Sequence, residues 1–239
     1  MADDDDADID YEAARAAELQ AICDQQLQEL LSKRDIFNAT FSKLTPSVAN
    51  KISTEARRIR NYQSPTLSYG EIEFESFGSL VCSLTKHGVD LGAMRTFIDI
   101  GSGTGKAVVC AALMGIFEKC TGIEIIAEVH KASTQMLKSF FKNCVSISEA
   151  VGIDFILGDA TFMDWSKTDM IFIHATCFDE ATMNRIISTA SKMKNGSVVI
   201  VLSQRLDNNS RVCHYFVTTV LFTIVSCHIT YYYLQQAQL

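Results

Sequence analysis

The residues with the clearest chemical potential are three glycines that alternate with small polar residues after an apolar run containing an acid. This segment reads Thr96-Phe97-Ile98-Asp99-Ile100-Gly101-Ser102-Gly103-Thr104-Gly105-Lys106. The apolar run predicts a buried strand, and the glycines allow the backbone to turn tightly and approach a ligand closely. The apolar segment that follows predicts a helix whose free N–H groups face that ligand. The pattern predicts a site for a nucleotide-like cofactor.

Spacing and charge distinguish among the ligands that such a turn could hold. A phosphate-binding P-loop needs a glycine five positions before its Gly-Lys pair and Ser or Thr after it, but Ile100 and Ala107 stand there. A dinucleotide fingerprint needs Gly-x-Gly-x-x-Gly, and this chain has Gly-x-Gly-x-Gly. Asp99 would repel a pyrophosphate but suits a cation. Because S-adenosylmethionine carries a sulfonium and an ammonium group, we expect this methyl donor.

Two further acids stand at the ends of predicted strands. Glu124 ends the strand predicted over 119–124, where a carboxylate can accept both hydroxyls of a ribose. Asp159 follows the strand predicted over 154–157 and can accept a hydrogen bond from the adenine amine. Because the carboxyl ends of parallel strands meet at one edge of a sheet, we expect both acids and Asp99 to outline one pocket.

The elements that must position these acids alternate between strands and helices from Thr96 onward. Strands are predicted over 96–100, 119–124, 154–157, 170–174 and 198–203, and helices over 105–116, 127–143 and 179–193. Such alternation predicts an α/β fold, with a Rossmann-like, mostly parallel sheet covered by helices on both faces. Upstream, helices are predicted from Tyr11 to about Arg34, from Thr45-Pro46 through Arg60, and over 74–87.

These patterns divide the chain into four parts. We expect an acidic disordered tail over 1–10, an N-terminal helical region over 11–62, a catalytic domain over 63–211 and an uncharged hydrophobic tail over 212–239. The last part contains no Asp, Glu, Lys or Arg. Three interpretations stay open for it: the final strands of the sheet, a membrane span, or an artefact of the gene model after Arg211.

Composition restricts the functional class and the compartment. A net charge of −7 argues against a protein that coats nucleic acid by itself, so any direct nucleic-acid binding should be weak. The eight cysteines form no C-x-x-C pair and no cluster at zinc spacing, which predicts core cysteines and no metal site. With no signal-peptide pattern, a reducing compartment is expected, nucleus or cytosol. Nothing in the pattern indicates an oligomeric state.

Taken together, the motifs resemble the catalytic domain of the Dot-one histone methyltransferases, the lysine methyltransferases that lack a SET domain. The resemblance spans roughly 62–206 and is carried by Tyr69-Gly70-Glu71, the glycine-rich run, Gly122-Ile123-Glu124, Gly158-Asp159 and the segment from Ile171 to Phe178. It implies a class I methyltransferase fold with S-adenosylmethionine as cofactor. It also implies a nuclear enzyme that methylates a lysine in the globular core of histone H3, within the nucleosome.

The resemblance also assigns roles to individual residues. Those expected to close over the cofactor are Tyr69, Gly70, Glu71 and Ile72. Those expected to hold its methionine part are Phe97, Asp99, Gly101, Ser102, Gly103, Thr104, Gly105 and Lys106. Glu124 would hold the ribose, and Asp159 with Ala160 the adenine. The segment from Phe172 to Phe178 would line the lysine channel, with His174 and Phe178 as the catalytic candidates.

The chain departs from the family pattern at two places. Family members usually carry a pair of asparagines and a Phe-Ala-Phe at the channel wall, where this chain has His174-Ala175-Thr176-Cys177-Phe178. Lys106 stands where the family often has a neutral Gln, and a cation beside a sulfonium is unexpected unless it points outward. Two alternatives therefore stay open. One is a class I methyltransferase acting on another protein, RNA or a small molecule, and the other is a non-catalytic scaffold.

Overall fold

The computed structural model describes residues 4–62, 70–144, 150–175, 178–204, 217–225 and 228–235. Side-chain environments are described within these ranges except at 4–10, at Asn143 and from 203 onward. Tyr69, one of the predicted cofactor residues, lies outside the described residues, as do the Thr176 and Cys177 positions of the predicted channel.

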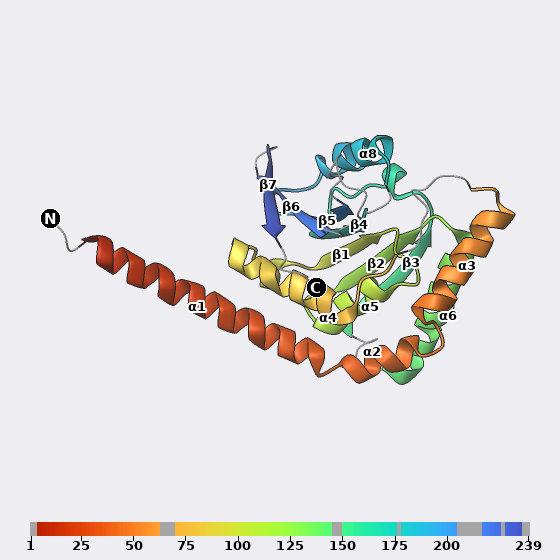
Figure 1. The fold of residues 1–239 in the computed structure, drawn as a ribbon, viewed down its shortest axis with the longest axis horizontal. Coiled ribbons are helices and arrows are strands. Elements are labelled where there is room, and N and C mark those ends of the chain that lie inside the picture. Colours follow the sequence, from red (N-terminus) through yellow and green to blue (C-terminus); the bar gives the residue numbers. More distant parts are fainter. Residues whose placement is uncertain are drawn as a thin grey trace, which may run out of the picture.

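One seven-stranded sheet organises the chain, with the strand order β3-β2-β1-β4-β5-β6-β7 (Figure 1). Its parallel strands are β1 (Thr96–Ile100), β2 (Lys119–Glu124), β3 (Gly152–Leu157), β4 (Met170–His174) and β5 (Val198–Gln204). The antiparallel strands β6 (Val217–Val225) and β7 (His228–Gln235) extend it beyond β5. The parallel part confirms the expected Rossmann-like class I architecture.

The central strands are apolar on both faces because both faces are covered by helices. In β4, Met170 and Phe172 point into one core, whereas Ile171 and Ile173 point into the other. Helices α4 (Phe74–Ser83), α5 (Lys106–Met114) and α6 (Ala127–Asn143) cover the first face, and α8 (Glu180–Ala190) covers the second (Figure 1). The short turn η2 (Leu84–His87) continues α4.

Parallel register brings the ends of the three acid-bearing strands together. Asp99 of β1 lies beside Gly122 of β2, and Glu124 of β2 lies beside Leu157 of β3, two residues before Asp159. The loops after these strands therefore leave the sheet at one edge, as predicted for the pocket.

The N-terminal region consists of α1 (Asp4–Leu31), α2 (Arg34–Phe41) and α3 (Pro46–Ile59). Only the C-terminal part of α1 packs on the sheet layer, through the fully buried Leu30, and the rest of the helix projects away from it (Figure 1). Gly78 on α4 makes this packing possible, since a Cβ there would lie 2.3 Å from a Leu30 methyl carbon. The helix α2 was not predicted; it buries Phe37 and Phe41.

The structure differs from one expectation for this region and agrees with another. The acidic run at the N-terminus was expected to be disordered, but α1 begins at Asp4. Carboxylates in a first helical turn are favoured by the positive end of the helix dipole, which explains how the acidic run can be helical. The start of α3 agrees with the prediction, because the Thr45 side chain accepts a hydrogen bond from the Val48 N–H and Pro46 opens the first turn.

The uncharged tail contains strands in the structure. β6 pairs with β5 from Val217 to Thr223, and β7 pairs with β6 along its whole length. Within the described residues, no helix combines the length and the apolar character that a membrane crossing requires. Sequencing of the transcript across Arg211 remains the test of the gene-model interpretation.

Candidate cofactor site

The glycine turn after β1 is held in a conformation that favours glycine. Gly101, Gly103 and Gly105 have φ angles of 74°, 56° and 91°, in the left-handed region. The N–H groups of Gly101 and Ser102 both donate to the Ile123 carbonyl on β2, at 2.9 and 3.0 Å. Side chains larger than hydrogen are also excluded by space at Gly105, where a Cβ would lie 2.3 Å from the Phe155 ring.

Glu124 is fixed at the end of β2 by backbone donors on both sides. Its Oε2 accepts from the Gly103 N–H at 2.9 Å, and its Oε1 accepts from the Ile126 N–H at 2.8 Å. Burial raises the pKa of this carboxyl, although the N–H donors oppose the rise. Each carboxylate oxygen retains a lone pair after these bonds, so the group can accept two hydroxyl protons from a ligand.

Asp159 is oriented by the short helical turn η4 (Ala160–Phe162) that it caps. Its Oδ1 accepts from the Thr161 N–H at 2.9 Å and from the Thr161 hydroxyl at 2.7 Å. Asp99 is nearly inaccessible, and burial followed by repulsion from Glu124 raises its pKa to about 8. The edge of the sheet therefore carries buried carboxyls whose charged forms a nearby cation would stabilise.

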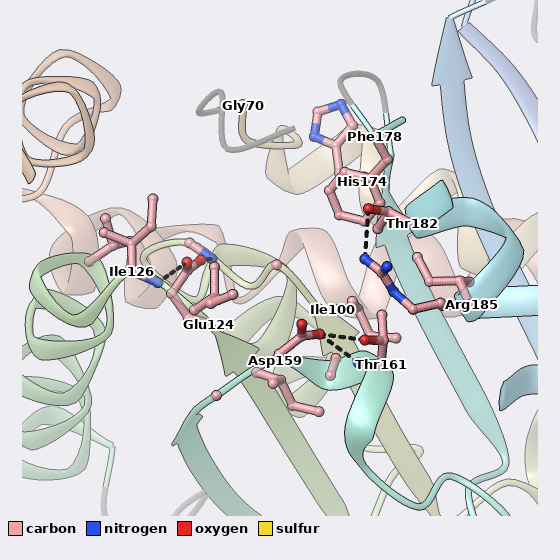
Figure 2. Close-up of a pocket in the computed structure, with 18 of the residues that line it drawn as sticks. Gly70, Ile100, Glu124, Ile126, Asp159, Thr161, His174, Phe178, Thr182 and Arg185 are labelled. Carbon is pink, nitrogen blue, oxygen red and sulfur yellow. Dashed lines mark hydrogen bonds between the residues drawn. The ribbon is translucent and has the colours of Figure 1, made fainter. Parts of the chain in front are cut away.

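A cavity of about 290 Å³ opens at this edge. In Figure 2, Glu124 and Ile126 lie at one end of it, Asp159 and Thr161 lie at its floor, and His174 and Phe178 lie opposite Glu124. The volume is near the lower limit of small-molecule sites. Its lining combines apolar side chains with a few fixed polar groups, which is the usual character of a cofactor site.

The segment from Gly70 to Ile72 is tied to the glycine turn through Glu71. The Thr104 hydroxyl donates to Glu71 Oε1, and Lys106 Nζ lies 2.7 Å from Glu71 Oε2. Both side chains of the ion pair are about nine-tenths buried. The Lys106 ammonium also lies 5.9 Å from the centre of the Phe41 ring. The charge of Lys106 is thus balanced by Glu71, outside the cavity lining.

His174 and Phe178 flank the cavity on the side of β4. A Cβ built on Gly70 would lie 3.2 Å from Cε1 of His174, and one built on Gly101 would lie 3.7 Å from Cζ of Phe178. Burial lowers the pKa of His174, and a hydrogen bond to the Gly70 backbone opposes this effect. The imidazole is therefore neutral at pH 7 and has one ring nitrogen that can accept a proton.

The cavity collects about half of the predicted site residues. Those that line it are Gly70, Gly101, Gly103, Glu124, Asp159, Ala160, His174 and Phe178. Those described but absent from the lining are Glu71, Ile72, Phe97, Asp99, Ser102, Thr104, Gly105 and Lys106. Of these, Phe97 needs correction as a cofactor contact. It lies near the start of β1, is fully buried, and packs edge-on against Phe77 with the ring centres 5.8 Å apart.

Several lining residues were not predicted. Three of them lie within two residues of predicted acids, and this proximity in the sequence could have indicated them: Ile125, Ile126 and Thr161. Those on one face of α8 are Thr182, Arg185 and Ile186, whose i, i+3, i+4 spacing was also available. Ser53 on α3 has no signal of this kind, because it precedes the glycine turn by almost fifty residues.

Metal chemistry and disulfides have no visible support in the described part of the chain. No group of three or more His, Cys, Asp or Glu side chains there could hold a metal ion. The described cysteines, Cys23, Cys82, Cys110, Cys120 and Cys144, are buried free thiols. Burial raises the pKa of the Cys82 thiol to about 12, so this side chain acts as a small apolar core residue.

The chemistry of these residues fits S-adenosylmethionine as the ligand. Gly101 and Gly103 of the glycine turn line the cavity, and Glu124 and Asp159 are positioned to accept hydrogen bonds from a ribose and an adenine. Burial raises the pKa of Glu124 in the cavity lining and of Asp99 near it, so a bound cation would favour the charged forms of both carboxyls.

Comparisons with known proteins found a matching family model and a curated relative. The family model "Histone methylation protein DOT1" matches residues 49–232. A curated protein of Caenorhabditis elegans, "Histone-lysine N-methyltransferase, H3 lysine-79 specific", is 28% identical over 160 residues, which are 64% of this chain and 16% of the relative. The chain thus spans only a small part of that relative's length.

Solved structures with similar folds are more distant. The plantazolicin methyltransferase BpumL, solved with S-adenosylhomocysteine, is 17% identical with a TM-score of 0.44 and covers 77% of this chain and 63% of its own. A S-adenosylmethionine-dependent methyltransferase of Thiobacillus denitrificans, also solved with S-adenosylhomocysteine, is 16% identical with a TM-score of 0.39 and covers 61% and 52%.

Proposed function

The chain belongs to the DOT1 family of histone methylation proteins, and from this premise we propose that it is an S-adenosylmethionine-dependent histone-lysine methyltransferase. The proposed substrate is a lysine in the globular core of histone H3 within the nucleosome, and the proposed location is the nucleus. The name of the Caenorhabditis elegans relative, which specifies lysine-79 of H3, supports this choice of substrate.

The observation that carries the proposal is the placement of Glu124 in the cavity beside the glycine turn. Backbone N–H donors from Gly103 and Ile126 hold its carboxylate so that it can accept the two ribose hydroxyls. Asp159 and Ala160 would hold the adenine, and Gly101 and Gly103 would surround the methionine part. When bound, the cofactor supplies an electrophilic methyl group.

The residues at the opposite end of the cavity would prepare the acceptor amine. A lysine side chain must lose its ammonium proton before its nitrogen can attack, and an apolar channel favours the neutral amine. Phe178 would form one wall of this channel. His174 would accept the proton at its free ring nitrogen, while its hydrogen bond to the Gly70 backbone fixes the orientation of the ring.

Methyl transfer to defined acceptors tests this proposal. The protein is incubated with tritiated S-adenosylmethionine and nucleosomes, free histones or total RNA, and mass spectrometry then locates the modified residue. We expect label on H3 in nucleosomes. Label on RNA alone would refute the histone assignment, and absence of cofactor binding in calorimetry would favour a non-catalytic scaffold.

A further inference from the structure

The hydroxyl of Ser53 is a polar group of the cavity to which the proposed function gives no role. Ser53 lies in the middle of α3, its side chain is fully buried, and it lines the cavity. Its Oγ has no hydrogen-bond partner among the described residues. A buried hydroxyl in this state destabilises the folded protein unless a ligand or a water satisfies it.

Two other buried serines show how such a hydroxyl can be satisfied within the protein, whereas the Oγ of the buried Ser102, outside the cavity lining, also has no partner among the described residues. The Oγ of Ser133 on α6 donates to the His130 carbonyl at 2.7 Å, and that of Ser197 donates to the Thr168 carbonyl at 2.7 Å. Ser53 makes no such bond within its helix. The other buried residues of α3 are Ala49 and Ala56, which carry no polar side-chain group.

The position of Ser53 relative to the sheet is fixed by contacts between α3 and α6. Ala56 packs with Ile126 and Val129 in one buried cluster. On the surface, the Arg60 guanidinium binds both carboxylate oxygens of Glu128 at 2.8 to 3.2 Å. Ile126 and Val129 also line the cavity, and the Ile126 N–H is one of the donors that hold Glu124. Because Ser53 lines the cavity and lies three residues before Ala56 on the same helix, we infer that it faces the end of the cavity that contains Glu124.

We propose that Ser53 donates a hydrogen bond to a ribose hydroxyl of the bound cofactor, so that α3 forms one wall of the cofactor site. The chemistry is complementary, since a ribose hydroxyl that gives its proton to Glu124 still has lone pairs for a donor. The Ser53 hydroxyl has no acceptor for its proton in the described structure, and the Glu124 carboxylate oxygens have lone pairs free to accept protons from a ligand. The identity of the ligand rests on the proposed function.

Calorimetric titration with S-adenosylhomocysteine and with its 2′-deoxy and 3′-deoxy ribose analogues tests this contact. Ser53→Ala should lower the affinity for S-adenosylhomocysteine by about 3- to 10-fold, the range for one neutral hydrogen bond. For one deoxy analogue, which lacks the hydroxyl that Ser53 reaches, wild type and variant should bind equally. Ser133→Ala is the matched control, because it removes an equally buried but satisfied hydroxyl outside the cavity.

Thermal unfolding without ligand supplies the second readout. Removal of an unsatisfied hydroxyl should leave the melting temperature of Ser53→Ala unchanged or raise it, whereas a structural serine would lower it. Ser53→Cys, which preserves the size of the side chain, serves if the alanine variant folds poorly.

Three results would overturn the assignment. They are undiminished affinity in Ser53→Ala, an equal loss for all three ligands, and a lower melting temperature in both Ser53 variants. Undiminished affinity would leave an ordered water as the partner of the hydroxyl. A wild-type protein that binds none of the ligands would instead refute the proposed cofactor.

Discussion

The ion pair between Lys106 and Glu71 gives a prediction that can be worked out quantitatively. It joins the first residue of α5 to the Gly70–Ile72 segment, with 2.7 Å between Nζ and Oε2 and only 10% and 9% of the two side chains exposed. We expect Lys106→Met, which keeps the length and the apolar stem of the side chain, to destabilise the protein strongly.

The magnitude follows from the burial of the pair. At 2.7 Å and an effective dielectric constant of about 20, the attraction between the two charges is roughly 6 kcal/mol. Part of this attraction offsets the cost of removing both charges from water. Removal of one partner of a buried ion pair costs about 3–5 kcal/mol in general. Because Thr104 still donates to Glu71, the lower end of this range is expected.

Urea unfolding of the whole chain, monitored by circular dichroism, measures the loss of unfolding free energy, and thermal unfolding measures the change in melting temperature. For a protein of this size, a loss of about 3 kcal/mol corresponds to a decrease in melting temperature of roughly 6–12 °C. The double variant Lys106→Met with Glu71→Gln should recover most of the loss, because neither charge then remains unpaired. Arg58→Met is the control, since it removes an exposed ion pair with Glu55 and should cause no measurable change.

The reasoning fails if the free energy of unfolding of Lys106→Met lies within about 1 kcal/mol of the wild-type value. It also fails if the double variant is as unstable as the single variant. The first result would mean that water reaches Glu71 in spite of its low exposure. The second would mean that the buried charge left on Glu71 is not the cause of the loss.

Further predictions concern the site itself. Glu124→Gln should weaken S-adenosylhomocysteine binding roughly 10- to 100-fold in calorimetry, because hydrogen bonds to a charged acceptor are lost. The control variant Glu118→Gln, at an exposed position, should bind like the wild type. Equal effects of the two substitutions would contradict the assignment of Glu124. Because the folded protein raises the pKa of Asp99 to about 8, the contribution of this group to stability without ligand is complete below about pH 4 and is lost progressively as pH rises to about 8. Asp99→Asn should remove this part of the pH dependence in urea unfolding, and an unchanged slope between about pH 4 and 8 would be contrary evidence. His174→Gln should slow nucleosome methylation by on the order of a hundredfold or more. Because the pKa of His174 is lowered from its usual 6.5, kcat/KM of the wild type should rise with pH at a pH below 6.5, and the variant should lack this rise. A rise that persists in the variant would exclude His174 as the proton acceptor.

The strands were predictable because buried parallel strands are short apolar runs with sharp boundaries. β1, β2 and β4 have the predicted bounds, and β3 and β5 differ by one or two residues. The helix α2 was missed because its eight residues are too few to establish a helical period.

The site was less predictable because a motif is continuous in sequence while a cavity is not. The glycine run suggested that Phe97 and Lys106 contact the cofactor, but the strand turns Phe97 into the core and Glu71 pairs with Lys106 away from the cavity. Ser53 could not be predicted from the sequence, since only the packing of α3 on α6 brings it into the cavity lining. Glu124 and Asp159 both line the cavity because parallel register makes neighbours of the strand ends, whereas Asp99 lies outside the lining.

The packing of α3 on α6 changes what counts as the smallest working piece of this protein. The boundary at residue 62 separates helices from the catalytic domain by composition, yet the cavity takes its lining from Ser53 to Ile186. Exchange of the helical region between relatives would therefore alter a ligand contact as well as a surface. A chimaera that joins α3 of one homologue to the sheet of another should therefore keep Ser53 together with Ile126 and Val129. These residues line the same cavity and must be inherited together.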